Sequence, residues 1–84
     1  MYEIKIKPSA LKEFKKLPDD IKGQIRSKVE QLREEPRHSG VRKLTGRNDV
    51  YRMRAGIYRV LFQVDDDEHI VRILSVRKRN KAYK

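Results

Sequence analysis

The sequence contains no cysteine. This absence excludes disulfide bonds, thiolate metal sites and a cysteine nucleophile, and therefore also thiol-based redox chemistry. The chain also lacks any apolar run close to the roughly 20 residues that a membrane-spanning helix needs. Residues 1–7 alternate charged and apolar side chains, a pattern unlike the apolar core of a signal peptide. We therefore expect a cytoplasmic protein.

Groups for acid–base catalysis or metal binding are scarce. The chain has two histidines, and the pattern sets no acid or nucleophile beside either His38, in a polar loop, or His69, next to an acidic turn. The acids at 65–68 fit a solvated turn better than a metal site, because consecutive side chains alternate in direction. No glycine-rich phosphate loop or zinc-ligand spacing is present. We expect neither a metal ion nor a cofactor.

Positive charge dominates the second half of the chain. The sequence has 22 Lys and Arg against 12 Asp and Glu, a net charge of +10. Residues 1–36 contribute +2 (9 basic, 7 acidic) and residues 37–84 contribute +8 (13 basic, 5 acidic). Basic residues that merely keep a protein soluble explain the first half well and the second half poorly. The clustered charge indicates a nucleic-acid partner, with an anionic membrane surface as the weaker interpretation, so we expect no membrane partner.

The chain is long enough for one small domain, 1–84, with a single modest core. Apolar spacings predict a short helix over 10–17, capped by Ser9, and a second helix over about 18–35. Alternating side chains predict five strands, over residues 2–7, 42–44, 50–55, 58–64 and 70–76. The predicted fold class is α+β, with an N-terminal strand and a two-helix hairpin packed on one face of a small, mostly antiparallel sheet.

The predicted pairing of these strands puts arginines on one face of the sheet. A turn at Gly56 makes Arg54 face Arg59, and the acidic turn at 65–68 makes Arg59 face Ser75. The arginine face then carries Arg52, Arg54, Arg59, Leu61, Ile73, Ser75 and Arg77. The face expected to form the core under the helices carries Tyr51, Met53, Tyr58, Val60, Phe62, Ile70, Arg72, Leu74 and Val76. Because like charges opposite one another destabilise a sheet, the arginine face makes physical sense mainly with a bound polyanion.

This set of residues is compatible with RNA cleavage. RNA carries its own nucleophile, the ribose 2′-hydroxyl, so a protein need only position it and neutralise the pentavalent phosphate that forms. Tyr83 could stack on an unstacked base or transfer a proton. Packing of a loose tail explains Tyr83 equally well.

The order of the predicted elements and several short segments resemble the RelE branch of the RelE/ParE toxin superfamily. The segments that carry the resemblance are Phe14, Leu17 and Pro18, Leu44 with Gly46, YRMRAGIYRVLF at residues 51–62, and SVRKR at residues 75–79 followed by Tyr83. The resemblance covers nearly the whole chain. It implies the RelE fold, which is similar to that of microbial ribonucleases.

The resemblance also implies a function. It implies the toxin of a type II toxin–antitoxin system, a metal-independent endoribonuclease that contacts ribosomal and messenger RNA in the ribosomal A site and cuts the messenger there. It implies a cognate RelB-like antitoxin, whose complex with the toxin forms higher oligomers. Carried over by position, the catalytic residues are Arg52, Arg54, Arg59, Arg79 and Tyr83. Around them we expect RNA contacts from Arg47, Arg77, Lys78 and Lys81, whereas Arg26 and Lys28 on the second helix should matter far less.

Two departures from the family leave alternatives open. The family often has lysine where this chain has Arg52 and Arg54, and arginine does not lose a proton, so Tyr83 is the best remaining general base. The segment RKR at residues 77–79 stands where many relatives have Gly-His-Arg, so it provides no histidine acid. A ParE-like inhibitor of DNA gyrase would keep the fold without the catalysis, and a non-catalytic RNA-binding module would explain the charge alone.

Overall fold

The computed structural model describes residues 1–44, 46 and 49–78. The elements, in chain order, are β1 Glu3–Ile6, α1 Pro8–Lys15, α2 Asp19–Gln31, β2 Val41–Lys43, β3 Val50–Ala55, β4 Tyr58–Asp65 and β5 Ile70–Lys78. They confirm the predicted α+β fold and the predicted order of elements.

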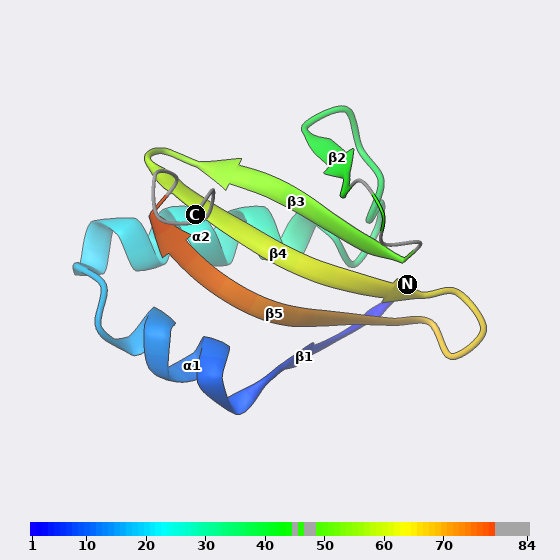
Figure 1. The fold of residues 1–84 in the computed structure, drawn as a ribbon, viewed down its shortest axis with the longest axis horizontal. Helices are drawn as coiled ribbons and strands as arrows, with labels where there is room; N and C mark the ends of the chain where they lie inside the picture. Colours follow the sequence, from blue (N-terminus) through cyan, green and yellow to red (C-terminus); the bar gives the residue numbers. More distant parts are fainter. Residues whose placement is uncertain (45, 47–48, 79–84) are drawn as a thin grey trace.

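The five strands form one mixed sheet in the order β1-β5-β4-β3-β2. β1 runs parallel to β5, and the other neighbouring strands are antiparallel. Both helices lie on the same side of the sheet (Figure 1), where α1 packs against β5 and α2 against β3. We call the opposite side the open face, because no helix in the described part of the chain covers it.

A proline marks the start of each helix. Pro8 is the first residue of α1, where a backbone N–H would have no helical partner in any case. The N-cap residue is Lys7 and makes no side-chain cap hydrogen bond, so the predicted Ser9 cap is wrong. Pro18 is the N-cap residue of α2, and two aspartates follow it near the positive end of the helix dipole.

The second helix is shorter than the sequence pattern suggests. It ends at Gln31, whereas the apolar spacing predicts an end near residue 35. The backbone N–H of Leu32 then bonds to the carbonyl of Val29, a tighter turn than that of an α-helix. Neither helix described here is long and apolar enough to cross a membrane.

The core lies between the helices and the sheet. Its buried side chains are Ala10, Ile25, Leu32, Met53, Ala55, Val60, Phe62, Val64, Val71, Ile73 and Val76. Phe62 is the largest of them, and its ring stacks on Tyr51 with 5.9 Å between the ring centroids. Burying a side chain of this size stabilises a fold by about 1.5–3 kcal/mol, so Phe62 anchors the middle of the sheet to the helices.

A β-bulge interrupts the pairing of β4 with β5. Leu61 is paired with Ser75, whereas its neighbour Phe62 is paired with Ile73. Leu74 is therefore an extra residue with no partner in the β4–β5 register. Because a bulge shifts the side-chain alternation by one residue, the two halves of β5 follow different phases.

The faces predicted for β5 are partly wrong, because strict alternation along the strand does not allow for the bulge. Arg59 is paired with Arg77 and not with Ser75. Ile73, predicted on the arginine face, is 2 % exposed and belongs to the core. The residues predicted in the core but found half-buried outside it are Ile70, Arg72 and Leu74. Arg72 is paired with Gln63, two positions from Leu61 on the open face, so its charge does not point into the core.

A polar cluster joins the N-terminus, the segment after α2 and the β4–β5 turn. Arg37 donates hydrogen bonds to both carboxylate oxygens of Asp66, at 3.2 and 2.8 Å, and to Tyr51 Oη at 2.9 Å. Tyr2 Oη donates to Asp66 Oδ1 at 2.6 Å, and its ring stacks on His69. The hydrogen bonds from Arg37 hold the pKa of Asp66 below its usual value, and the bond to Asp66 raises the pKa of Tyr2.

Candidate nucleic-acid interface

Arginines lie directly opposite one another across the open face. Arg54 on β3 is paired with Arg59 on β4, as the turn at Gly56 predicts. Arg59 is also paired with Arg77 on β5. At the edge of the sheet, Arg42 on β2 is paired with Arg52 on β3. The arginine row, as we call Arg42, Arg52, Arg54, Arg59 and Arg77, therefore crosses four neighbouring strands.

The arginine row opposes the stability of the sheet. Cross-strand pairs typically change stability by about 0.2–1 kcal/mol each, and like charges opposite each other destabilise. The row contains three arginine pairings, and the repulsion in one of them is offset within the protein because Arg77 forms an ion pair with Glu13. An anion bound along the row removes this repulsion, so the arrangement favours a ligand with several negative charges in a line.

Exposure differs along the row. Arg59 is 3 % exposed and is the one charged residue that the described part of the chain buries. Arg52 is half-buried and Arg54 is exposed. The sequence predicts an exposed face at all three positions, so the burial of Arg59 is a correction. The row therefore combines a buried cation near its centre with solvated cations toward β2.

Glu13 on α1 occupies the β5 end of the row. Its Oε2 accepts a hydrogen bond from Arg77 Nε at 2.7 Å, and its Oε1 accepts one from the backbone N–H of Val76 at 2.9 Å. Glu13 therefore binds the edge of β5 beyond the end of β1 and neutralises Arg77. The sequence pattern does not reveal this residue, whose only local signal is that it is the one acid in a helix with two lysines.

Of the remaining predicted site residues, the described part of the chain includes only Lys78. Lys78, a predicted RNA contact, is exposed at the end of β5. The predicted site residues that lie outside the described part of the chain are Arg47, Arg79, Lys81 and Tyr83.

Each histidine has a neighbour within the protein: His38 contacts its own loop, and His69 contacts the segment before β1. His38 Nδ1 accepts a hydrogen bond from the backbone N–H of Gly40 at 3.1 Å. His69 stacks on Tyr2 with ring centroids 4.9 Å apart. Within the described residues, no three His, Cys, Asp or Glu side chains gather to hold a metal ion. The cationic row is therefore the chemical feature that this part of the chain offers.

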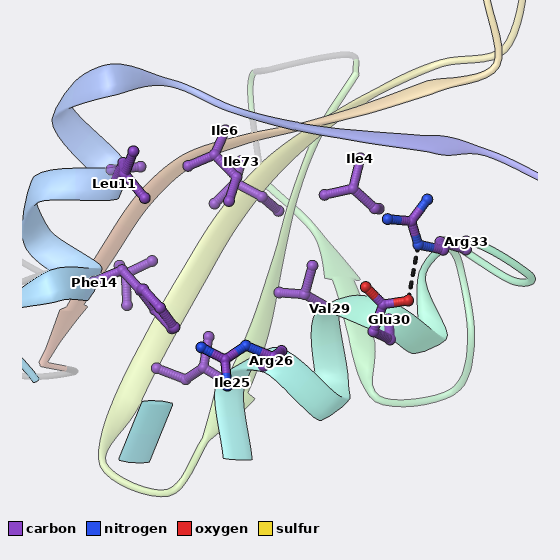
Figure 2. Close-up of a pocket in the computed structure, with 12 residues that line it drawn as sticks. Ile4, Ile6, Leu11, Phe14, Ile25, Arg26, Val29, Glu30, Arg33 and Ile73 are labelled. Atoms are coloured by element: carbon purple, nitrogen blue, oxygen red, sulfur yellow. Dashed lines mark hydrogen bonds and ion pairs between the residues drawn. The ribbon is translucent and has the colours of Figure 1, made fainter. Parts of the chain in front are cut away.

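The helix side of the molecule differs in character from the open face. A pocket of about 270 Å³ opens between α1, α2 and β1 (Figure 2), and most of its lining is apolar, including the partly exposed Ile6 and Leu11. The guanidinium of Arg26 lies 5.6 Å from the ring centroid of Phe14 in this pocket. The protein thus has a cationic surface on one side of the sheet and an apolar pocket on the other.

Comparisons with known proteins agree with this architecture. Residues 4–83 match the family described as "ParE toxin of type II toxin-antitoxin system, parDE". The chain is 36% identical over 75 residues to the mRNA interferase toxin RelE of Escherichia coli (strain K12), and the alignment covers 87% of this chain and 78% of that protein.

Two solved complexes contain a chain of the same fold. A chain in the crystal structure of the intact E. coli RelBE toxin–antitoxin complex gives a TM-score of 0.82 at 34% identity, covering 93% of this chain and 96% of that chain. A chain in the archaeal RelE–RelB complex from Pyrococcus horikoshii OT3 gives a TM-score of 0.83 at 30% identity, covering 95% and 97%. The match over nearly the whole sequence and the shared fold lead to one conclusion: the chain belongs to the RelE/ParE toxin superfamily, in its RelE-like branch.

Proposed function

We propose that this protein is the toxin of a type II toxin–antitoxin system, an endoribonuclease that cleaves messenger RNA in the ribosomal A site. The observation that carries the proposal is the Arg54–Arg59 pair, two guanidinium groups on neighbouring strands of which one is buried. Similarity to an mRNA interferase supports the reaction. The proposed place of action is the cytoplasm, where messengers are translated.

In the proposed reaction, the ribose 2′-oxygen attacks the adjacent phosphorus. The bond from phosphorus to O2′ forms and the bond to O5′ breaks. The 2′-hydroxyl proton passes to a base, and the departing 5′-oxygen takes up a proton. The products are a 2′,3′-cyclic phosphate and a new 5′-hydroxyl end.

The arginines supply the charge stabilisation in this scheme. Because Arg59 is 3 % exposed, its charge acts in surroundings of low dielectric constant, where stabilisation of a developing anion is stronger. Arg52 and Arg54 orient the RNA backbone. Arg79 is assigned to the leaving oxygen, and Tyr83 to stacking on the nucleotide or deprotonating it. The roles of these last two residues rest on the family resemblance.

The ribosome is part of this proposal for a chemical reason. The described part of the row offers guanidinium groups, and arginine does not act as a base. Free RNA should therefore be a poor substrate. Holding the reacting groups in the right geometry can lower a barrier by about 7–11 kcal/mol, and in this scheme the ribosome provides that positioning.

The proposed partner is a RelB-like antitoxin, since both solved complexes described above pair RelE with RelB. The two sides of the molecule suit such a segment. Acidic residues of the antitoxin neutralise the arginine row, and an apolar helical stripe fits the pocket between α1, α2 and β1. Binding of this kind should be tight and sensitive to salt.

Gyrase inhibition is the second candidate, because the matching family model describes a ParE toxin. A gyrase inhibitor acts through protein contacts and has no need of a buried arginine on an open sheet face. The arginine row therefore favours messenger cleavage over this alternative.

Primer extension on a translated messenger tests the proposal. Purified protein is added to a translation reaction, and the same messenger is incubated with the protein in the absence of ribosomes. We expect new 5′ ends, seen as stops of the extended primer within codons, only when ribosomes are present. Rapid cutting of the free messenger would overturn the ribosome dependence, and an intact messenger with relaxed plasmid DNA would favour gyrase inhibition.

A further inference from the structure

Among the described strands, none is paired with β3 on its β2 side at Arg54. β2 is paired with β3 only from Val41 opposite Met53 to Lys43 opposite Tyr51, so in the described sheet β3 continues past β2 at Arg54. A groove of about 370 Å³ lies at this position. The residues that line it are Lys28, Ser39, Gly40, Arg42, Arg52, Met53 and Arg54.

The groove gathers positive charge from three separate elements. Lys28 comes from α2, Arg42 from β2, and Arg52 and Arg54 from β3. None of the described residues that line the groove is acidic. Guanidinium groups bind phosphate oxygens through paired hydrogen bonds, and an ammonium group adds a point charge. The composition of the groove therefore suits a phosphate group.

The segment before β2 holds the groove in shape. The backbone N–H of Gly40 donates to His38 Nδ1 at 3.1 Å. A Cβ atom at position 40 would lie 3.1 Å from His38 Cε1, so a larger residue would push the imidazole away. Gly40 therefore keeps bare backbone beside the hydroxyl of Ser39, and the groove is formed before a ligand arrives.

The groove continues the arginine row. Arg54 lines the groove and is also paired with Arg59. Neighbouring strands lie about 4.7–4.9 Å apart, so β2 is about 10 Å from β4. When an RNA strand crosses the sheet with one phosphate at the Arg54–Arg59 pair, a neighbouring phosphate of the same strand lies at the groove.

We propose that this groove is a second phosphate site for the RNA substrate, in which Lys28 and Arg42 hold a backbone phosphate other than the one that is cleaved. The inference rests on the proposed function and adds two residues to it. From the sequence, Lys28 on the second helix is expected to matter far less than the arginines of the sheet. At the edge of β3, however, α2 and the open face meet in one groove.

An RNA backbone fits the groove better than a protein segment does. A docking peptide helix needs exposed apolar side chains to bury. The one apolar side chain that lines the groove, Met53, is 1 % exposed. The groove therefore offers charge and hydrogen-bond donors, and the one apolar side chain in its described lining is buried.

The salt dependence of RNA binding tests this site. The probe is a short single-stranded 2′-O-methyl RNA, which cannot be cleaved, and binding is followed by fluorescence anisotropy. The variants are Lys28→Gln and Arg42→Gln. Lys22→Gln, which removes the same charge from α2 outside the groove, is the matched control. We expect each groove variant to reduce the slope of log K against log salt by about 0.7, the value for one lost phosphate contact on a single strand, and the control to leave it unchanged.

Cleavage on the ribosome gives a second measurement. A residue that holds a distant phosphate should raise the half-saturating concentration of programmed ribosomes and leave the maximal rate unchanged. Unchanged salt slopes in both groove variants would overturn the inference, as would weaker antitoxin binding with intact RNA binding. Reduced slopes without any cleavage by the wild-type protein would instead support the phosphate site and contradict the proposed function. Urea unfolding of each variant shows whether it folds.

Discussion

Glu13 and Arg77 form an ion pair at 2.7 Å that joins α1 to the end of β5. The same carboxylate accepts a hydrogen bond from the backbone N–H of Val76, a donor on the edge of β5 that lies beyond the end of β1. Arg77 thus enters the arginine row with its charge already neutralised within the protein.

Glu13→Gln should strengthen RNA binding. The amide oxygen of glutamine can still accept the Val76 N–H, but the charge that holds Arg77 is gone. We expect higher affinity for a single-stranded RNA and a salt slope steeper by about 0.7, measured by fluorescence anisotropy. The partly exposed ion pair should cost about 0.2–1 kcal/mol of stability when it is lost. Glu30→Gln, which breaks the ion pair between Glu30 on α2 and Arg33 just after that helix, should leave the slope unchanged. An equal effect of the two variants would contradict this prediction.

Arg59→Ala should lower both activity and stability. Arg59 is 3 % exposed, so its removal takes away packed side-chain atoms as well as a charge. We expect single-turnover cleavage to fall by about 10²–10³ and the free energy of unfolding to fall by about 0.5–3 kcal/mol. Arg54→Ala, at an exposed position, should affect cleavage without that loss of stability. Unchanged cleavage by Arg59→Ala would remove this residue from the site.

Arg54→Gln should make the protein more stable. The substitution removes a positive charge directly opposite Arg59, and relief of one such pair should raise the free energy of unfolding by about 0.2–1 kcal/mol. The gain should shrink at high salt, where the repulsion is already screened. Urea unfolding at low and high salt measures both effects. Lys43→Gln removes an equal charge opposite Tyr51 and should give no such gain; similar gains from both would point to net charge alone.

Asp66→Asn should destabilise the protein in a pH-dependent way. The pKa of Asp66 is lowered by hydrogen bonds from Arg37 and Tyr2. A lowered folded-state pKa gives stability that is present above the unfolded-state pKa of about 3.9 and is lost as the pH falls through the folded-state value. The wild type should therefore resist urea better than the variant near neutral pH, and the gap should close in acid. Asp67→Asn, in the same turn, is the control, and a gap that persists in acid would refute the assignment.

The sequence patterns suffice for the elements but not for the register of β5. Polar residues fix the phase of β3 at Arg52 and Arg54, and that of β4 at Arg59, Gln63 and Asp65. In β5 the residues at 70, 71, 73, 74 and 76 are all apolar, so the pattern fits either phase and cannot reveal the bulge at Leu74. The one sign in the sequence that the predicted phase of β5 is wrong is Arg72, because burying its charge in the core would cost free energy.

In the candidate site, too, the sequence reveals local contacts but not contacts between distant elements. The Arg54–Arg59 pair follows from a tight turn between adjacent strands, a local relationship that a sequence displays. Glu13 and Arg77 are 64 positions apart, and Lys28 meets Arg42 only where a helix crosses the sheet edge. Contacts of this kind depend on how whole elements pack, so no spacing rule along the chain predicts them.

The parallel pairing of β1 with β5 affects when the fold can form. Glu3–Ile6 is paired with residues 70–73, and β5 also separates β1 from β4. β1 can therefore pair in the sheet only after β5 has been synthesised. Contacts between such distant segments form late, because closing the intervening chain costs entropy first. Arg77 also joins Arg59 only when β5 is in place, so the arginine row is complete only after β5 has joined the sheet.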